Sequence, residues 1–195
     1  TYRGRDGSLT DTTMDWDDPL CEAFMEGAMS LGIPRNPDYN GAIQEGVSYC
    51  QRTIEKGLRM SAAKAFLHPA RKRGNVDVRT HAHVTNIIFE GKRAVGVRYL
   101  RGGKGGTPVE VRASKEVILS GGAYNSPQVL QLSGVGSPEL LQSLGIEVRH
   151  ALPGVGEGLQ DHYAPRSVAR VKNIRTINEL RRGVSLWVEA LKWAT

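Results

Sequence analysis

Residues 120–136, SGGAYNSPQVLQLSGVG, combine glycines, a Ser-Pro pair and a short apolar segment. They follow the hydrophobic run KEVILS (115–120), which predicts a strand buried on both faces of a layered α/β domain. Glycines at the carboxyl end of such a strand let a ligand approach the backbone, and the helix expected from Ser126 presents N–H groups that favour an anion. A sharp turn that needs Gly121 and Gly122 explains the same residues equally well, so their spacing leaves both interpretations open.

Few other residues have the type and spacing of a chemical site. Cys21 and Cys50 stand in no CxxC pair and near no His at ligand spacing, so we expect buried free thiols in a reducing compartment. His81 and His83 form an H-x-H pair without a third ligand, which favours an exposed strand face over a metal site. The sequence contains no GxSxG, HExxH, P-loop or GxGxxG motif, and the glycine-rich PGVGEGL (153–159) is interpreted as a structural turn.

The composition indicates an ordinary globular domain. Hydrophobic residues make up 39% of the 195 residues and charged residues 24%, and no apolar run is long enough to span a bilayer. The net charge of +6 is spread along the chain rather than gathered on one aromatic-rich face, which argues against nucleic-acid binding. A polyanionic cofactor or an acidic membrane surface remains compatible. Because the chain starts at Thr1 and ends within an expected helix, we expect a fragment of a longer protein.

Apolar periodicity and capping residues predict mixed α/β structure. Asp18, Pro19 and Gly32 bracket a first helix, Ser61 begins a second, and Gly57 lies in the turn of a strand pair. From residue 75 the period changes to two, which predicts a strand over 76–84, a hairpin over 85–101 with its turn at EGK (90–92), and further strands over 108–113 and 115–120. A helix capped by Ser126 and begun by Pro127 should follow, then a short helix from Ser137 to Gly145. The last segment has a Thr176–Glu179 capping box and a helical stripe expected to be core: Ile177, Leu180, Val184, Trp187, Val188 and Leu191.

The run GAYNSPQVLQLSGVG (122–136) resembles the second signature of the glucose–methanol–choline (GMC) family of flavoprotein oxidoreductases. All fixed positions of that signature are met. Three further stretches resemble family segments in the same order: residues 40–70 the substrate side, residues 78–99 the FAD-side hairpin, and LPGVGEGLQDH (152–162) a family loop. The bacterial alcohol and choline dehydrogenase branch is the most similar.

The resemblance implies part of an FAD-binding α/β domain interleaved with part of a substrate-binding domain. Residues 1–70 and 165–195 would belong to the substrate side, and residues 71–164 to the FAD side. The implied cofactor contacts are Val84 at the adenine, Ser120, Gly121 and Gly122 beside the adenosine half, and Asp161 and His162 near the flavin. Gly158 stands where the family usually has Asn, so the hydrogen bond of that side chain is lost. Gly121 stands where Ala is common, which is a mild change.

The implied activity is oxidation of an alcohol to an aldehyde or ketone by hydride transfer to flavin. The family's GxGxxG unit and catalytic His would lie outside this chain, so no residue here is assigned a catalytic role and no metal is expected. The implied partners are a small alcohol and an electron acceptor, either quinone-like or O₂, with peripheral membrane association compatible and a cytoplasmic or inner-membrane-associated location expected. A cyanohydrin lyase that keeps FAD, and an inactive remnant or module, are the alternatives.

Overall fold

A computed structural model describes residues 4–13, 17–174 and 176–194. The chain divides into two compact units, one made of Thr1–Asp77 with Val171–Thr195 and the other of Val78–Arg170. Helices and sheets occur together, as expected for the mixed α/β class. The assignment of either unit to a cofactor or a substrate side stays a prediction.

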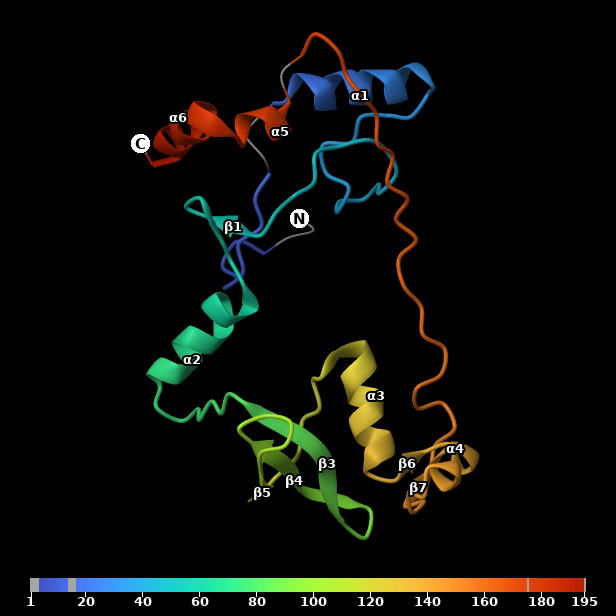
Figure 1. Cartoon of the computed structure of the whole chain (residues 1–195). Helices are drawn as coiled ribbons and strands as arrows, with labels where there is room; N and C mark the ends of the chain where they lie inside the picture. The colour runs from blue at the N-terminus through green and yellow to red at the C-terminus, as the bar shows by residue number, and fades with distance from the viewer. Residues whose placement is uncertain (1–3, 14–16, 175, 195) are drawn as a thin grey trace. The chain divides into compact units, whose positions relative to one another are not determined.

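The Val78–Arg170 unit is built around an antiparallel sheet with strand order β3-β4-β5 (Figure 1). Its strands are β3 (Ala82–Glu90), β4 (Arg93–Arg101) and β5 (Thr107–Arg112), as predicted for the hairpin and the third strand. The separate strand predicted over residues 76–84 is wrong: residues 76–81 form no strand and residues 82–84 are the start of β3, because His81, with φ of +53°, interrupts the extended backbone before it. Ile87 in β3 and Tyr99 in β4 are buried on one face of this sheet. The β3–β4 register shifts between Val84 and Asn86 and again between Ile88 and Phe89, so β3 is irregular on both sides of Ile87.

Helix α3 (Gly122–Leu132) packs beside β3 (Figure 1). The prediction that Ser126 caps this helix and Pro127 begins it is wrong, because the helix starts at Gly122 and Pro127 lies inside it. Ser126 nevertheless has a terminal role, since its Oγ accepts a hydrogen bond of 2.9 Å from the N–H of Gly121. Proline is tolerated this early in a helix because it removes only one hydrogen bond of the N-terminal turns.

A small parallel pair follows α3. Strands β6 (Val135–Gly136) and β7 (His150–Ala151) flank helix α4 (Pro138–Ser143), whose predicted Ser137 cap is present, with Oγ accepting from the N–H of Leu140. The side chain of Leu141 is completely buried between these elements. After α4 the only strand in the described part of the chain is β7, which has two residues.

The buried strand predicted over residues 115–120 is not formed. The segment is extended but pairs with no strand in the described part of the chain, and Ile118 is 78% exposed. A strand buried on both faces needs neighbouring strands and covering helices, and these residues have neither here.

The other unit contains α1 (Pro19–Ser30), β1 (Ile54–Glu55), β2 (Leu58–Arg59), a π-helical turn η1 (Ala63–Leu67), α2 (His68–Lys72), α5 (Ile177–Leu180) and α6 (Gly183–Ala194). The predicted cap of α1 is present, because Asp18 Oδ1 accepts from the N–H groups of Leu20 and Cys21. The strand pair turns at Lys56–Gly57 as expected. Across residues 4–13, 17–174 and 176–194 no helix has both the length and the apolarity to cross a membrane.

The C-terminal stripe is not a core within this chain. Thr176 and Glu179 do begin a helix, with the N–H of Thr176 donating to Glu179 Oε2 at 3.0 Å. The helical segment then breaks between α5 and α6, and Trp187 is 72% exposed. The expectation of burial was wrong because an amphipathic pattern specifies a face, and burial depends on what packs against it.

Candidate pocket between a strand edge and helix α3

A pocket of about 380 Å³ lies between β3, the extended segment 117–121 and α3. This volume is within the range of small-molecule sites, about 300–1,000 Å³. Its floor is apolar and its helical wall carries two amides. The lining residues are Ala82, His83, Val84, Ile87, Val97, Val117, Ile118, Leu119, Ser120, Gly121, Asn125, Gln128 and Val129.

Three of the predicted cofactor residues meet at this pocket. Val84 comes from β3, whereas Ser120 and Gly121 come from the segment before α3, more than thirty residues later in the chain. Gly122, the first residue of α3, adjoins Gly121 but does not line the pocket. The pocket therefore brings together three residues that the resemblance implies for the adenosine half of the cofactor.

Asp161 and His162 are not brought to this pocket. They lie exposed in an extended stretch, where the N–H of His162 donates to Asp161 Oδ1 at 2.8 Å. Their assignment near a flavin stays a prediction.

Sequence reasoning did not select Asn125 and Gln128, the two polar side chains of the helical wall. Residues three apart in a helix lie on the same face, so the N-x-x-Q spacing was a usable signal once residues 122–132 are known to be helical. A helix that begins at Pro127, as predicted from the sequence, leaves Asn125 outside it. Ile87 and Val129 were missed because their proximity depends on how α3 packs on β3.

Among the described residues, none that lines the pocket is acidic, and the pocket lies at the amino-terminal half of α3. An eleven-residue helix carries a partial positive charge at that end, from its unpaired N–H groups and its dipole. The apolar floor suits a flat heteroaromatic group, and the amides suit a sugar joined to it. The positive helix end suits an attached phosphate.

Gly158, where the resemblance stated above implies Asn, lies in a left-handed conformation with φ of +66°. An added Cβ there meets no atom within 4 Å, and Asn tolerates this conformation better than other side chains do. We expect Gly158→Asn to change the free energy of unfolding by less than about 0.5 kcal/mol in chemical denaturation.

The matched control for this substitution is Gly156→Asn. Its Cβ would lie 2.6 Å from Gln131 Nε2, which donates to the carbonyl of Val155. A cost for Gly158→Asn as large as that of the control would contradict an open site at residue 158.

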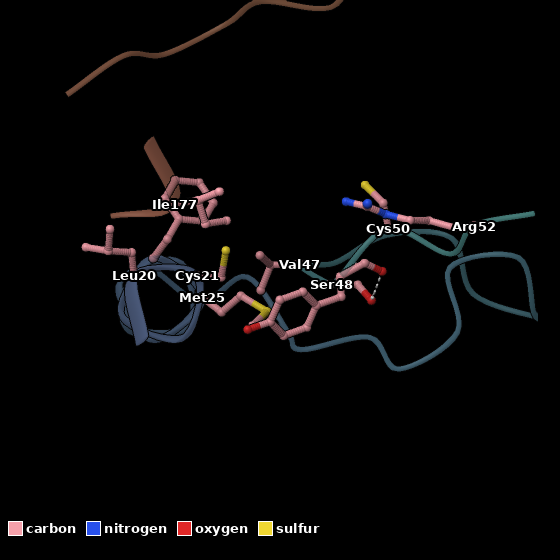
Figure 2. A pocket seen from close by; sticks show the side chains of 10 residues that line it. Leu20, Cys21, Met25, Val47, Ser48, Cys50, Arg52 and Ile177 are labelled. Atoms are coloured by element: carbon pink, nitrogen blue, oxygen red, sulfur yellow. Dashed lines mark hydrogen bonds between the residues drawn. The ribbon is translucent and has the colours of Figure 1, made fainter. Parts of the chain in front are cut away.

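A second pocket, of about 390 Å³, lies within the other unit (Figure 2). It is bounded by α1, the segment 47–52 and Ile177, and its walls are mostly hydrocarbon and sulfur. Tyr49 is fixed beside it, because the N–H of Asp18 donates to its hydroxyl at 2.9 Å. Such a wall fits an apolar group.

Cys21 and Cys50 both line this second pocket, and both are free and exposed. The expectation of buried thiols was wrong, because both stand at an open cavity rather than in a packed core. Partial desolvation raises the pKa of the Cys21 thiol, and the neighbouring Asp18 carboxylate raises it further.

Cys21 should therefore react slowly at neutral pH. In the variant Cys50→Ser, Cys21 is the only thiol of the chain. Because its pKa is raised above 9, the ordinary thiol pKa, we expect the rate of its alkylation to keep rising as the pH passes 9. Asp18→Asn preserves the helix cap but removes the charge, so it should move the inflection to lower pH. Identical rate profiles with Asp and Asn at residue 18 would exclude the charge effect.

Among the described residues, no group of three or more His, Cys, Asp or Glu side chains could hold a metal ion. His81 and His83 are exposed, as expected, and His83 lies at the edge of the first pocket.

Comparison with known proteins identifies the family. The GMC oxidoreductase family matches residues 10–164. Oxygen-dependent choline dehydrogenases of Staphylococcus xylosus and of Staphylococcus aureus strain MSSA476 are 48% and 47% identical over 161 residues. The match covers 83% of this chain and 28% of each relative, so the chain spans less than a third of their length.

Solved structures give the same result. An FAD-dependent oxidoreductase from Chaetomium thermophilum superposes with a TM-score of 0.74 at 33% identity, over 78% of this chain and 26% of that one. Pyridoxine 4-oxidase from Mesorbium loti has a TM-score of 0.63 at 29% identity, over 77% of this chain and 29% of that one. The chain belongs to the GMC oxidoreductase family. The family assignment and the fold class predicted from the sequence are thus confirmed.

Proposed function

We propose that the protein to which this chain belongs is an FAD-dependent oxidoreductase that oxidises the CH–OH group of an alcohol to an aldehyde or ketone. The observation that carries the proposal is the shared pocket of Val84, Ser120 and Gly121. These residues come from two separate stretches that resemble cofactor-binding segments of the family. The similarity to oxygen-dependent choline dehydrogenases favours a small amino-alcohol as the substrate class.

The residues of the first pocket fit the adenosine half of FAD. The apolar side chains of Val84, Ile87 and Val129 suit an adenine face, and the amides of Asn125 and Gln128 suit sugar hydroxyls. The absence of acidic residues from the lining, together with the positive end of α3, suits the adjoining phosphate. When bound, the flavin supplies the acceptor for a hydride; the residues of this chain bind and orient the cofactor.

Gly122, Asp161 and His162 complete the proposed cofactor set, with the last two near the flavin. We assign residues 71–164 to the FAD side, and residues 1–70 and 165–195 to the substrate side. The apolar second pocket supports the latter assignment, because it offers a wall for hydrocarbon groups of a substrate. The electron acceptor is quinone-like or O₂. Free thiols at residues 21 and 50 support a cytoplasmic or inner-membrane-associated location.

The test uses the full-length protein. We expect a flavin absorption spectrum after gel filtration and bleaching of that spectrum when an alcohol is added without O₂. Release of cyanide and an aldehyde from a cyanohydrin, with the flavin remaining oxidised, would instead identify a lyase. Absence of flavin and of both reactions would identify an inactive relative and overturn the proposal.

A substitution in the pocket tests the proposed cofactor contact. A Cβ on Gly121 would lie 3.2 Å from Asn125 Cβ and from Ser126 N, so the larger side chain of Gly121→Val must shift α3 or enter the pocket. We expect FAD binding at least about tenfold weaker, measured by titrating the apoprotein. Gly154→Val is the matched control, because a Cβ there meets no atom within 4 Å. Equal FAD affinity of both variants would exclude this pocket as the site.

A further inference from the structure

Ser133, at the carboxyl end of α3, is a buried polar residue whose hydroxyl joins two elements far apart in sequence. The residue is 5% exposed. Its Oγ accepts a hydrogen bond of 2.8 Å from the N–H of Ile87 in β3, and donates one of 2.5 Å to the carbonyl of Val129 in α3. One hydroxyl therefore links the backbone of the strand directly to the backbone of the helix.

The hydrogen bond lies where the pairing of β3 with β4 is irregular. Ile87 is buried, and the β3–β4 register is interrupted on both sides of it. A buried N–H without a partner is costly, so loss of the Ser133 hydroxyl would force Ile87 to move or leave its N–H unpaired. This hydrogen bond therefore helps to fix the position of this part of β3 relative to α3, in addition to the packing of the two elements.

Both partners of Ser133 belong to the wall of the first pocket. Ile87 and Val129 line it, whereas Ser133 does not. At the other end of the helix, Ser126 Oγ accepts from the N–H of Gly121, which also lines the pocket. Two serine hydroxyls therefore tie α3 to the two segments that face it across the cavity.

We propose that Ser133 is a positioning residue that sets the width of the adenosine pocket, through its hydrogen bonds to Ile87 and Val129, without touching the cofactor. The inference rests on the proposed function. Ser133 would thus affect FAD affinity although it does not line the pocket. Affinity should depend on the hydroxyl because a few tenths of an ångström between β3 and α3 decide whether both faces of a flat ring are contacted.

The test compares variants of the full-length protein. Ser133→Ala removes the hydroxyl, and Ser133→Cys replaces it with a thiol, which is a weaker acceptor of similar shape. Ser133→Thr keeps the hydroxyl. We expect the dissociation constants of FAD and of ADP to rise about tenfold for Ala, by a smaller factor for Cys, and to return toward wild type for Thr. FMN, which lacks the adenosine half, should bind all four proteins equally.

Two further measurements separate positioning from general stability. Hydrogen exchange at the amide of Ile87 should become at least about tenfold faster in Ser133→Ala and recover in Ser133→Thr. Leu141→Val, in the same unit but outside the pocket lining, should lower stability without changing the FAD dissociation constant.

The outcomes are distinct. Faster exchange at Ile87 with unchanged FAD and ADP affinity would leave Ser133 a purely structural residue and overturn the inference while the proposed function stands. Should Ser133→Ala fail to fold, unchanged affinity in Ser133→Cys would overturn it equally. A wild-type protein that binds neither FAD nor ADP would overturn the proposed function, and the inference with it.

Discussion

Leu141→Ala should lower the free energy of unfolding of the Val78–Arg170 unit by about 3 kcal/mol, within the range of about 2–5 for buried leucines. Leu141 has no exposed surface, and a Cβ on the neighbouring Gly136 would already lie 3.7 Å from both of its methyl groups. Backbone hydrogen bonds fix its position: its own N–H donates to the carbonyl of Ser137, and the N–H groups of Leu144 and Ile146 donate to its carbonyl. The surrounding turn therefore has little freedom to collapse into the cavity left by truncation.

The measurement is hydrogen exchange of amides in the unit as a function of guanidinium concentration. This reports on the Val78–Arg170 unit alone, whereas a global probe would mix the two units. Leu144→Ala is the matched control: it removes the same atoms at the end of the same helix, but Leu144 is 63% exposed. Its cost should be below about 0.5 kcal/mol. Equal costs for the two substitutions would contradict the packing of α4 described above.

The second large effect is expected from Gly134→Ala. Gly134 follows α3 with φ of +84°, and an added Cβ would lie 2.5 Å from the carbonyl oxygen of Glu147. The carbonyl of Gly134 accepts from the N–H groups of Arg149 and His150, so the backbone cannot move away without breaking these bonds. Left-handed strain of about 1 kcal/mol adds to the clash, and we expect a total cost of about 3 kcal/mol and loss of the β6–β7 pairing.

Gly145→Ala separates the two causes of this cost. Gly145 also has a left-handed conformation, with φ of +69°, but a Cβ there meets no atom within 4 Å. Its substitution should therefore cost about 1 kcal/mol, from strain alone. Denaturation of the two variants, with exchange at the amides of residues 149 and 150, distinguishes them. If the costs of Gly134→Ala and Gly145→Ala in the free energy of unfolding differ by less than about 0.5 kcal/mol, the clash with the carbonyl of Glu147 is easily relieved and the prediction is wrong.

The features that could be predicted from the sequence are those determined by neighbours along the chain. Helix α1 has its cap at Asp18 and its end before Gly32 within one short stretch, and the β3–β4 hairpin is indicated by two strand-like runs joined at the turn residues 90–92. The family signature likewise lies within residues 122–136. Each of these signals is complete within a few turns or strands, so no knowledge of the tertiary structure was needed.

The features that could not be predicted depend on distant partners. Whether residues 115–120 pair as a strand depends on which strands lie beside them, and the exposure of Trp187 depends on what covers α6. In the candidate site, the sequence could indicate Val84 and Gly121 separately. The Ser133–Ile87 hydrogen bond joins residues 46 positions apart, and no local pattern encodes such a pairing.

The division of the chain into compact units also predicts an order of folding. Val78–Arg170 is one uninterrupted stretch, whereas the other unit combines Thr1–Asp77 with Val171–Thr195. The chain entropy lost on joining two segments grows with the logarithm of the intervening length, by about 0.6 kcal/mol for each doubling. Adjacent strands such as β3, β4 and β5 therefore meet quickly, as expected for contacts of low order. During synthesis the contiguous unit can close as soon as Arg170 has emerged, but Thr1–Asp77 must wait with apolar surface uncovered, so this first stretch is where a chaperone would be needed most.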